Sequence, residues 1–137
     1  MLKKVIWAVI AVFITWSLLD FLIHGLFLKS TYQATANLWR PEDEMKMGLM
    51  SFITFIFSLC FVAIYAYLIH PKSLSTGIRY GLILGFATGV SMGLGSYCYM
   101  PIPLSLAISW FAGSLIELSI AGVIVGFLVK SSGEFNN

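Results

Sequence analysis

Four long apolar stretches dominate the pattern of hydrophobic and polar positions along the chain. They cover residues 5–28, 46–70, 78–98 and 103–129, and the segments that flank them hold most of the charged residues. Each stretch meets the requirement of about 20 predominantly apolar residues for crossing the hydrocarbon core of a bilayer as a helix. The pattern predicts an all-α fold, an integral membrane four-helix bundle that forms a single transmembrane domain over residues 1–137.

The longest connection, KSTYQATANLWRPEDEM (29–45), joins the first two stretches. Its central part predicts a short helix lying at the membrane interface, with Tyr32 and Trp39 at the depth of the lipid headgroups. We expect Pro41 in the first turn of the second membrane helix, because proline suits that position. The acidic run 42–44 is then interpreted as capping the helix N-terminus rather than as a cation site.

The composition agrees with lipid as the solvent of this chain. Hydrophobic residues make up 59% of the sequence and charged residues 10%, whereas an ordinary soluble domain is about 25% charged. A chain of 137 residues has too much surface to bury so many apolar residues in one soluble core. The net charge of +2 is small and scattered, so we expect the lipid bilayer and not nucleic acid as a partner.

Basic residues in the flanking segments set the orientation in the membrane. One side holds Lys3, Lys4, Lys72, Arg79 and Lys130, and the other side holds Lys29, Arg40 and Lys46. The positive-inside rule then places both termini in the cytoplasm. The first stretch is expected to remain as an anchor, because it lacks the cleavage site of a signal peptide. Residues 131–137 are expected to form a polar tail.

The third stretch carries a regular glycine pattern. A glycine recurs at every fourth position, at Gly77, Gly81, Gly85, Gly89 and Gly93. Small residues four apart let membrane helices approach closely. The fourth stretch offers a matching surface, which includes Gly113, Gly122 and Gly126. We interpret the pattern as a helix-packing surface, within the bundle or between protomers, and a backbone-lined conduit is the functional alternative.

Three ionisable side chains lie inside the apolar stretches, namely Asp20, His24 and Glu117. An acidic residue at the centre of a membrane helix costs about 2.5–3.5 kcal/mol, so such residues face the bundle and need partners. Asp20 and His24 are four residues apart and can touch, and Trp16 lies one turn earlier. At about 1.5 Å per residue, Asp20 and Glu117 differ in depth by about one helical turn. The sequence therefore predicts a shared polar site.

Three interpretations of this polar group stay open. They are hydrogen bonding between helices, a proton- or cation-coupled binding site, and ligation of a metal or haem. A closed zinc site needs four ligands and the chain offers three candidates, so the metal stays unknown. Hydroxyl residues also share one face of the second stretch, and we expect them to make hydrogen bonds between helices rather than a polar lining. These residues are Ser51, Thr54, Ser58 and Tyr65.

An enzymatic function is not expected. No set of nucleophile, base and orienting group is apparent, and no glycine-rich phosphate loop follows a strand. Two cysteines at unrelated positions indicate neither a disulfide framework nor a zinc site. We expect no cofactor. The favoured function is a structural or accessory subunit of a membrane assembly, acting as a homo-oligomer or in a larger complex. The alternative is a small proton- or cation-coupled transporter or binding protein.

Two segments also carry a resemblance. The stretch DFLIHGLFLKSTYQATANLWRPEDEM (20–45), together with the PIPLSLAISWFAG turn (101–113) and the fourth helix, resembles a group of small four-helix bacterial integral membrane proteins with no established activity. The resemblance covers most of the chain. It implies the four-helix fold and a location in the bacterial inner membrane, and it adds nothing to the mechanism.

Overall fold

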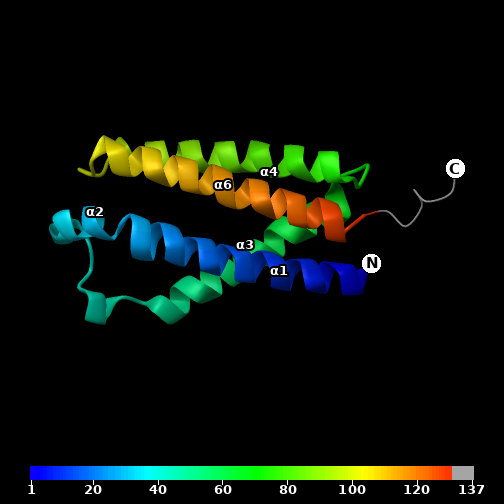
Figure 1. Ribbon diagram of the computed structural model, residues 1–137, viewed down its shortest axis with the longest axis horizontal. Helices are drawn as coiled ribbons and strands as arrows, with labels where there is room; N and C mark the ends of the chain where they lie inside the picture. Colours follow the sequence, from blue (N-terminus) through cyan, green and yellow to red (C-terminus); the bar gives the residue numbers. More distant parts are fainter. Residues whose placement is uncertain (131–137) are drawn as a thin grey trace, which may run out of the picture.

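The computed structural model describes residues 1–130, and four long helices make up most of this part of the chain (Figure 1). The helices that are long and apolar enough to cross a membrane are Leu2–Phe27, Met47–Leu68, Leu74–Tyr97 and Leu104–Leu128. No strand occurs within residues 1–130. The structure therefore confirms the predicted class, a bundle of four apolar helices. The polar tail expected at 131–137 lies outside the described residues.

Two of the four spans contain a π-helical segment. The first span consists of α1 (Leu2–Asp20) and the π-helical η1 (Phe21–Phe27), and the third consists of α4 (Leu74–Thr88), the π-helical η4 (Gly89–Leu94) and α5 (Gly95–Tyr97). The second span is α3 (Met47–Leu68) and the fourth is α6 (Leu104–Leu128). Between the first two spans lie α2 (Lys29–Ala34) and the 3-10 turns η2 (Ala36–Leu38) and η3 (Glu42–Glu44).

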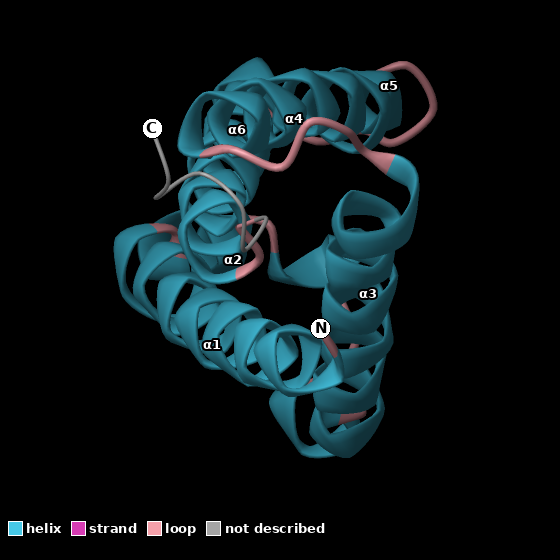
Figure 2. Cartoon of the chain, turned by 90° about the vertical axis from the view of Figure 1, so that its right-hand side faces the viewer, coloured by secondary structure: helices cyan, strands magenta, loops and turns pink. Residues whose placement is uncertain are grey.

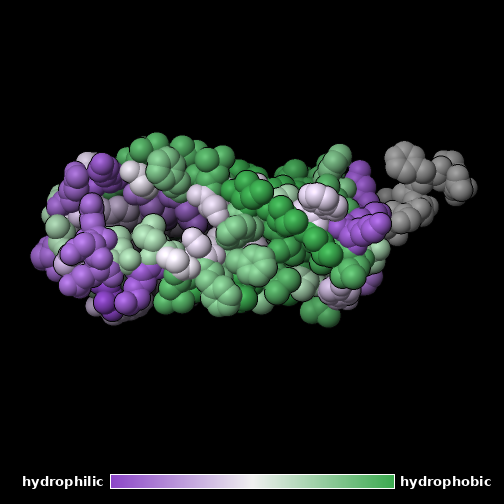
Figure 3. Space-filling view, turned by 90° about the horizontal axis from the view of Figure 1, so that it is seen from below, coloured by the Kyte–Doolittle hydropathy of each residue, from purple (hydrophilic) through white to green (hydrophobic). Residues whose placement is uncertain are grey.

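The two ends of the bundle differ in what they contain. The N-terminus of α1 and the C-terminus of α6 lie at the same end (Figure 1), where Lys4 Nζ donates to the Lys130 carbonyl oxygen at 3.1 Å. We call this the terminal end, and we call the opposite end, with residues 28–46 and 98–103, the loop end. A hydrophobic band separates hydrophilic residues at the two ends (Figure 3), as expected of a protein that crosses a bilayer.

The connection between the first two spans contains the short helix that the sequence predicts, but its second half differs from the prediction. Pro41 has a ψ of 149° and is not helical, and residues 42–44 form the separate turn η3. Met45 is extended and α3 begins only at Met47. The prediction that Pro41 and the acidic run start the second membrane helix is therefore wrong, because the extended Met45 interrupts the helical path.

The helices are grouped unequally. Viewed along the bundle, α4 and α6 lie together on one side, while α1 and α3 form the other two sides (Figure 2). All four helices contribute to an apolar core. Its buried residues are Val5, Ala8, Val9, Val12, Trp16, Phe61, Val62, Tyr65, Ala66, Tyr80, Leu118, Ala121, Val125 and Val129. A second, smaller cluster lies at the loop end and consists of Leu28, Ile102, Leu106 and Ala107.

Helix α3 is joined to the bundle mainly through its C-terminal half. There Tyr80 Oη donates to the Phe61 carbonyl oxygen at 2.8 Å, and Tyr65 Oη donates to the Ser73 carbonyl oxygen at 2.8 Å. The N-terminal half of α3 diverges from α6 (Figure 1), and ten of residues 47–57 are exposed. The ring pairs Phe13–Phe55 and Trp16–Phe57 join this half of α3 to α1.

The hydroxyl groups of Thr54 and Ser58 bond within α3 itself. Thr54 Oγ1 donates to the Met50 carbonyl oxygen at 3.1 Å, and Ser58 Oγ donates to the Thr54 carbonyl oxygen at 2.8 Å. For these two residues the expectation of hydrogen bonds between helices is wrong. The carbonyl oxygen four residues earlier lies within reach of a serine or threonine side chain in any helix, so it satisfies the hydroxyl without a partner helix.

Glycines bring the backbones of α4 and α6 into direct contact. A Cβ atom added to Gly85 would lie 3.1 Å from Leu115 Cα, and one added to Gly93 would lie 2.6 Å from the Phe111 main-chain nitrogen. Gly77 faces the main chain of Gly122. Gly113 instead faces Ile23 of η1. The five glycines of the third span therefore form a surface that packs against α6 of the same chain.

We predict that Gly85→Leu destabilises the bundle. The leucine would meet main-chain atoms of Leu115, which cannot move aside as a flexible side chain can. Overpacking of this kind costs on the order of 1–3 kcal/mol. Unfolding of the purified protein, followed by circular dichroism in mixed micelles, measures the loss.

Ala87→Leu is the matched control, because Ala87 is exposed and lies on the same helix. We expect its unfolding curve to match that of the wild type. Equal destabilisation by both substitutions would contradict a packing role specific to the glycine face.

Candidate functional site

The structure brings Asp20 and Glu117 together from different helices. Asp20 ends α1 and Glu117 lies near the middle of α6, and the two carboxyl groups are close enough for electrostatic interaction and a side-chain hydrogen bond. Two carboxyl groups can share a hydrogen bond only when one of them carries a proton. Glu117 Oε1 is buried and has no hydrogen-bond partner within residues 1–130. Apart from Asp20, no group of the described residues therefore offers this oxygen a hydrogen bond.

His24 lies beside this pair, within the π-helical segment η1. Segment η1 begins directly after Asp20, so the regular i, i+4 geometry of an α-helix does not hold from there on. His24 nevertheless interacts electrostatically with Asp20. Short π-helical insertions occur often at functional sites, where they redirect a side chain. Here the insertion carries an exposed imidazole that interacts electrostatically with Asp20.

A chain of hydrogen bonds connects His24 to α6. His24 Nδ1 lies 2.6 Å from Tyr32 Oη, and Trp110 Nε1 donates to the same Tyr32 oxygen at 2.7 Å. An indole nitrogen can only donate, so the Tyr32 hydroxyl is free to direct its own proton to His24 Nδ1. The neutral imidazole then carries its hydrogen on Nε2.

The Tyr32 hydroxyl is suited to keep its proton in this chain. Burial raises the pKa of Tyr32, and the hydrogen bond from Trp110 offsets part of that effect. The nearby Asp20 charge acts in the same direction as burial. Because the hydroxyl stays protonated near neutral pH, it remains a donor for the imidazole.

Aromatic rings surround the hydroxyl of Tyr32. Its ring packs edge-on against Trp39 at 5.5 Å between centroids, and Trp39 packs against Trp110 at 6.0 Å. Trp39 Nε1 donates to Thr35 Oγ1 at 2.9 Å. Both indole N–H groups are therefore satisfied by the protein, and we call Tyr32, Trp39 and Trp110 the aromatic wall.

Trp16 supports the site without lining it. Its side chain is only 3% exposed and packs against the rings of Phe57 and Phe61. Trp16 Nε1 donates to the main-chain carbonyl oxygen of Glu117 at 2.8 Å. Trp16 therefore lies in the apolar core and holds the turn of α6 that carries Glu117, whereas the sequence suggested a continuous stripe of Trp16, Asp20 and His24.

The candidate residues do not form a metal centre. Within residues 1–130, no group of three or more His, Cys, Asp or Glu side chains is arranged to hold a metal ion. The second histidine, His70, follows α3 at the terminal end, where its Nδ1 atom lies 3.2 Å from Lys72 Nζ. The two histidines are therefore at opposite ends of the bundle, and they cannot ligate one haem within a single chain.

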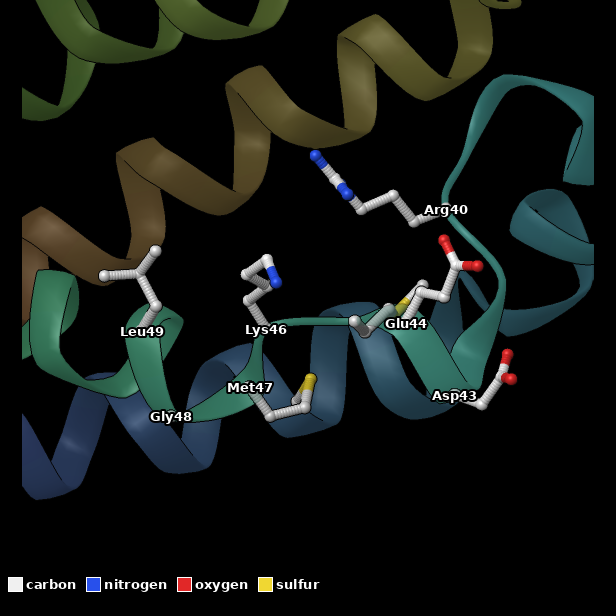
Figure 4. A pocket seen from close by; sticks show the side chains of 8 residues that line it. Arg40, Asp43, Glu44, Lys46, Met47, Gly48 and Leu49 are labelled. Carbon is white, nitrogen blue, oxygen red and sulfur yellow. The ribbon is translucent and has the colours of Figure 1, made fainter.

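A separate open pocket of about 670 Å³ lies at the loop end. Its lining residues are Arg40, Asp43, Glu44, Met45, Lys46, Met47, Gly48 and Leu49. Arg40 and Lys46 reach to the same side of this segment, whereas Asp43 points away (Figure 4). All eight residues are exposed, and neither Asp20 nor Glu117 lines the pocket. This charged surface is therefore distinct from the carboxyl pair.

No protein-family model, no curated protein and no solved structure matches this chain. The function of the carboxyl pair therefore has to be inferred from the geometry of the chain itself.

Sequence reasoning did not assign Tyr32 and Trp110 to the site. Tyr32 was expected at headgroup depth, and Trp110 received no role. One signal for Trp110 is its spacing, because it lies seven residues before Glu117 and so on the same face of α6. A second signal is that tyrosine and tryptophan side chains usually find a polar partner when they are buried.

We predict that Tyr32→Phe changes the tautomer of His24. The substitution removes the hydroxyl that donates to Nδ1, so the preference for hydrogen on Nε2 should weaken. The nitrogen shifts of histidine-labelled protein, measured by NMR in micelles, report which ring nitrogen is protonated.

His70 serves as an internal reference, since it lies at the other end of the bundle. Tyr67→Phe is the matched control, because Tyr67 is exposed on α3, and it should leave both histidines unchanged. Identical His24 shifts in the wild type and in Tyr32→Phe would contradict the hydrogen-bond chain.

Proposed function

We propose that this chain is a small membrane protein that binds a proton or a cation at the Asp20–Glu117 pair, as part of coupled transport or ligand binding. The observation that carries the proposal is the contact between two carboxyl groups within apolar spans, where no group of residues 1–130 other than Asp20 offers Glu117 Oε1 a hydrogen bond. Two adjacent carboxylates do not both ionise readily, because like charges repel. In a membrane the pair therefore favours a bound proton or cation.

Access to the pair is asymmetric. Toward the terminal end, the buried side chains of Trp16, Phe61 and Leu118 lie in the apolar core. Toward the loop end, the exposed His24 and its hydrogen bond to Tyr32 lie next to Asp20. An imidazole can accept and release protons near neutral pH. This arrangement supports exchange of the proton or cation with the loop end.

A structural or accessory subunit is the second candidate, and the N-terminal half of α3 favours it. This segment contacts α1 through the ring pairs Phe13–Phe55 and Trp16–Phe57. Its other large apolar side chains are exposed, so a second copy of the chain or another membrane protein could pack there. Lipid can cover the same surface, and for that reason we prefer the carboxyl pair as the functional site.

We also propose that the protein resides in a bacterial inner membrane with both termini in the cytoplasm. The basis is the larger number of basic residues in the segments at the terminal end. The loop end, with His24 and the aromatic wall, would then face the outside. Exchange with the carboxyl pair would accordingly take place from the outer side.

We predict that one proton is shared by Asp20 and Glu117. Infrared difference spectra of the protein in lipid, recorded across a pH titration, should show the carbonyl stretch of a protonated carboxyl group. Glu117→Gln should remove or shift this band, and so should Asp20→Asn, because each variant breaks the pair.

Glu44→Gln is the matched control, since Glu44 is an exposed carboxylate at the loop end. It should leave the band unchanged. A spectrum that is the same in the wild type and in both pair variants would refute proton binding at this site.

The proposed orientation predicts the labelling of the two cysteines. Both are exposed, but Cys98 lies at the loop end and Cys60 lies within the span of α3, where lipid would surround it. A membrane-impermeant thiol reagent added to intact cells should label Cys98 much faster than Cys60. Labelling of Cys98 only in broken cells would show that the orientation is inverted.

A further inference from the structure

Within residues 1–130, no lysine or arginine acts on Glu117, and the neighbouring group that can carry a positive charge is His24, which interacts with Asp20. The charged group that acts on Glu117 is Asp20, so one carboxyl group that can become negative lies next to another. Lysines and arginines occur near the two ends of the spans, at positions such as Lys4, Lys29 and Lys130. An uncompensated charge inside a membrane is costly. A positively charged ligand would balance the negative charge of the pair and would lie against the buried Glu117 Oε1 atom.

The aromatic wall next to the pair is suited to a cation. The indole N–H groups of Trp39 and Trp110 each donate a hydrogen bond to a neighbouring oxygen. These bonds fix the rings in place. Both rings pack against the smaller apolar cluster and stay partly exposed. A ring face that a ligand can reach attracts ammonium groups within about 6 Å of its centre. Tyr32 joins this wall to His24 and so to Asp20.

This combination of groups favours an organic cation over a metal ion. Metal ions such as Ca²⁺ and Zn²⁺ need several oxygen, nitrogen or sulfur ligands at close range, and the described part of the chain provides no group of three such side chains. An ammonium group needs fewer direct ligands. It can pair with one or two carboxylates on one side and lie against aromatic faces on the other.

The membrane side of the site suits a ligand with an apolar body. Helix α3 diverges from α6 toward the loop end, and apolar side chains of its N-terminal half are exposed, including Phe52, Ile53 and Ile56. In this half of the molecule the surface is hollowed, and hydrophilic residues lie in the hollow (Figure 3). A ligand could therefore place a charged head toward the bundle and a hydrocarbon tail along α3.

We propose that the site binds an organic ammonium cation attached to an apolar body, with Asp20 and Glu117 holding the charge and the aromatic wall holding the headgroup. The proposal rests on the proposed function, because it names the class of ligand for the same carboxyl pair. Both a free amphiphilic amine and a lipid with an ammonium headgroup carry this chemistry.

Equilibrium binding of radiolabelled octyltrimethylammonium to the full-length protein in dodecyl maltoside micelles tests the proposal. The probe is permanently charged, and the micelles contribute no ammonium group. We expect saturable binding, with affinity reduced about tenfold or more by Asp20→Asn or Glu117→Gln, because a buried charge loses its partner. Trp110→Leu should reduce affinity about three- to tenfold through loss of the ring face.

Two variants and one competitor control the measurement. Glu44→Gln and Trp7→Leu change an exposed carboxylate and an exposed tryptophan away from the site, and they should bind as the wild type does.

Unlabelled octyltrimethylammonium should displace the probe from the wild type, and the uncharged octyl glucoside should not. This competition remains decisive even if a site variant fails to fold. Displacement by octyl glucoside, or no saturable binding to the wild type, would overturn the proposal, and so would affinities unchanged by both carboxyl substitutions.

Added lipid identifies the source of the headgroup. Competition by phosphatidylethanolamine, and not by phosphatidylglycerol, would assign the site to a lipid, whereas no competition by either would assign it to a free amine. The infrared titration separates this proposal from the proposed function. A shared proton without cation binding would refute the ligand class alone. Absence of the protonated-carboxyl band from the wild-type spectrum would refute proton binding by the pair.

Discussion

The contact between the backbones of α4 and α6 is the constraint on which the remaining geometry depends. A Cβ atom on Gly77 or Gly81 would overlap main-chain atoms of α6, so these positions of α4 require glycine at this helix separation. Such close approach stabilises helix pairs in lipid, where burial of apolar surface supplies little drive for association. The contact also fixes the rotation of α6 about its own axis. As a result, Glu117 is presented toward Asp20 of the first span, and Trp110 toward Tyr32 of α2.

The environment of the carboxyl pair shows how its burial is tolerated. Trp16 anchors the main chain of Glu117 from the apolar core, and Trp110 fixes Tyr32 on the other side. These bonds hold the backbone and the neighbours in place, yet they leave Glu117 Oε1 unsatisfied. Buried polar atoms without a partner are rare in folded proteins and call for a specific explanation. A fold that satisfies the surrounding groups and leaves this one open is consistent with a site for a ligand or proton.

Hydropathy alone predicted the four long apolar helices to within a few residues, because a helix that crosses a bilayer needs about 20 apolar residues. Helical rise also placed Asp20 and Glu117 at similar depth, and the structure brings them together. The contact of Tyr32 with His24 could not be predicted, since it depends on a π-helical segment and on the path of the connecting loop. The start of α3 was missed for a related reason. The local geometry of the loop makes Met45 extended, and this delays the start of α3. The proline and the acidic residues had suggested an earlier helix start.

The two halves of the bundle differ in packing, and the carboxyl pair lies at the boundary between them. In the terminal half, side chains from all four helices meet in one buried core. In the loop half, α3 leaves the other helices and exposes most of its apolar side chains. Regions with few buried contacts open at lower free-energy cost than well-packed cores. A shift of the N-terminal half of α3 could therefore change access to Asp20 and Glu117 while the glycine contact between α4 and α6 stays intact.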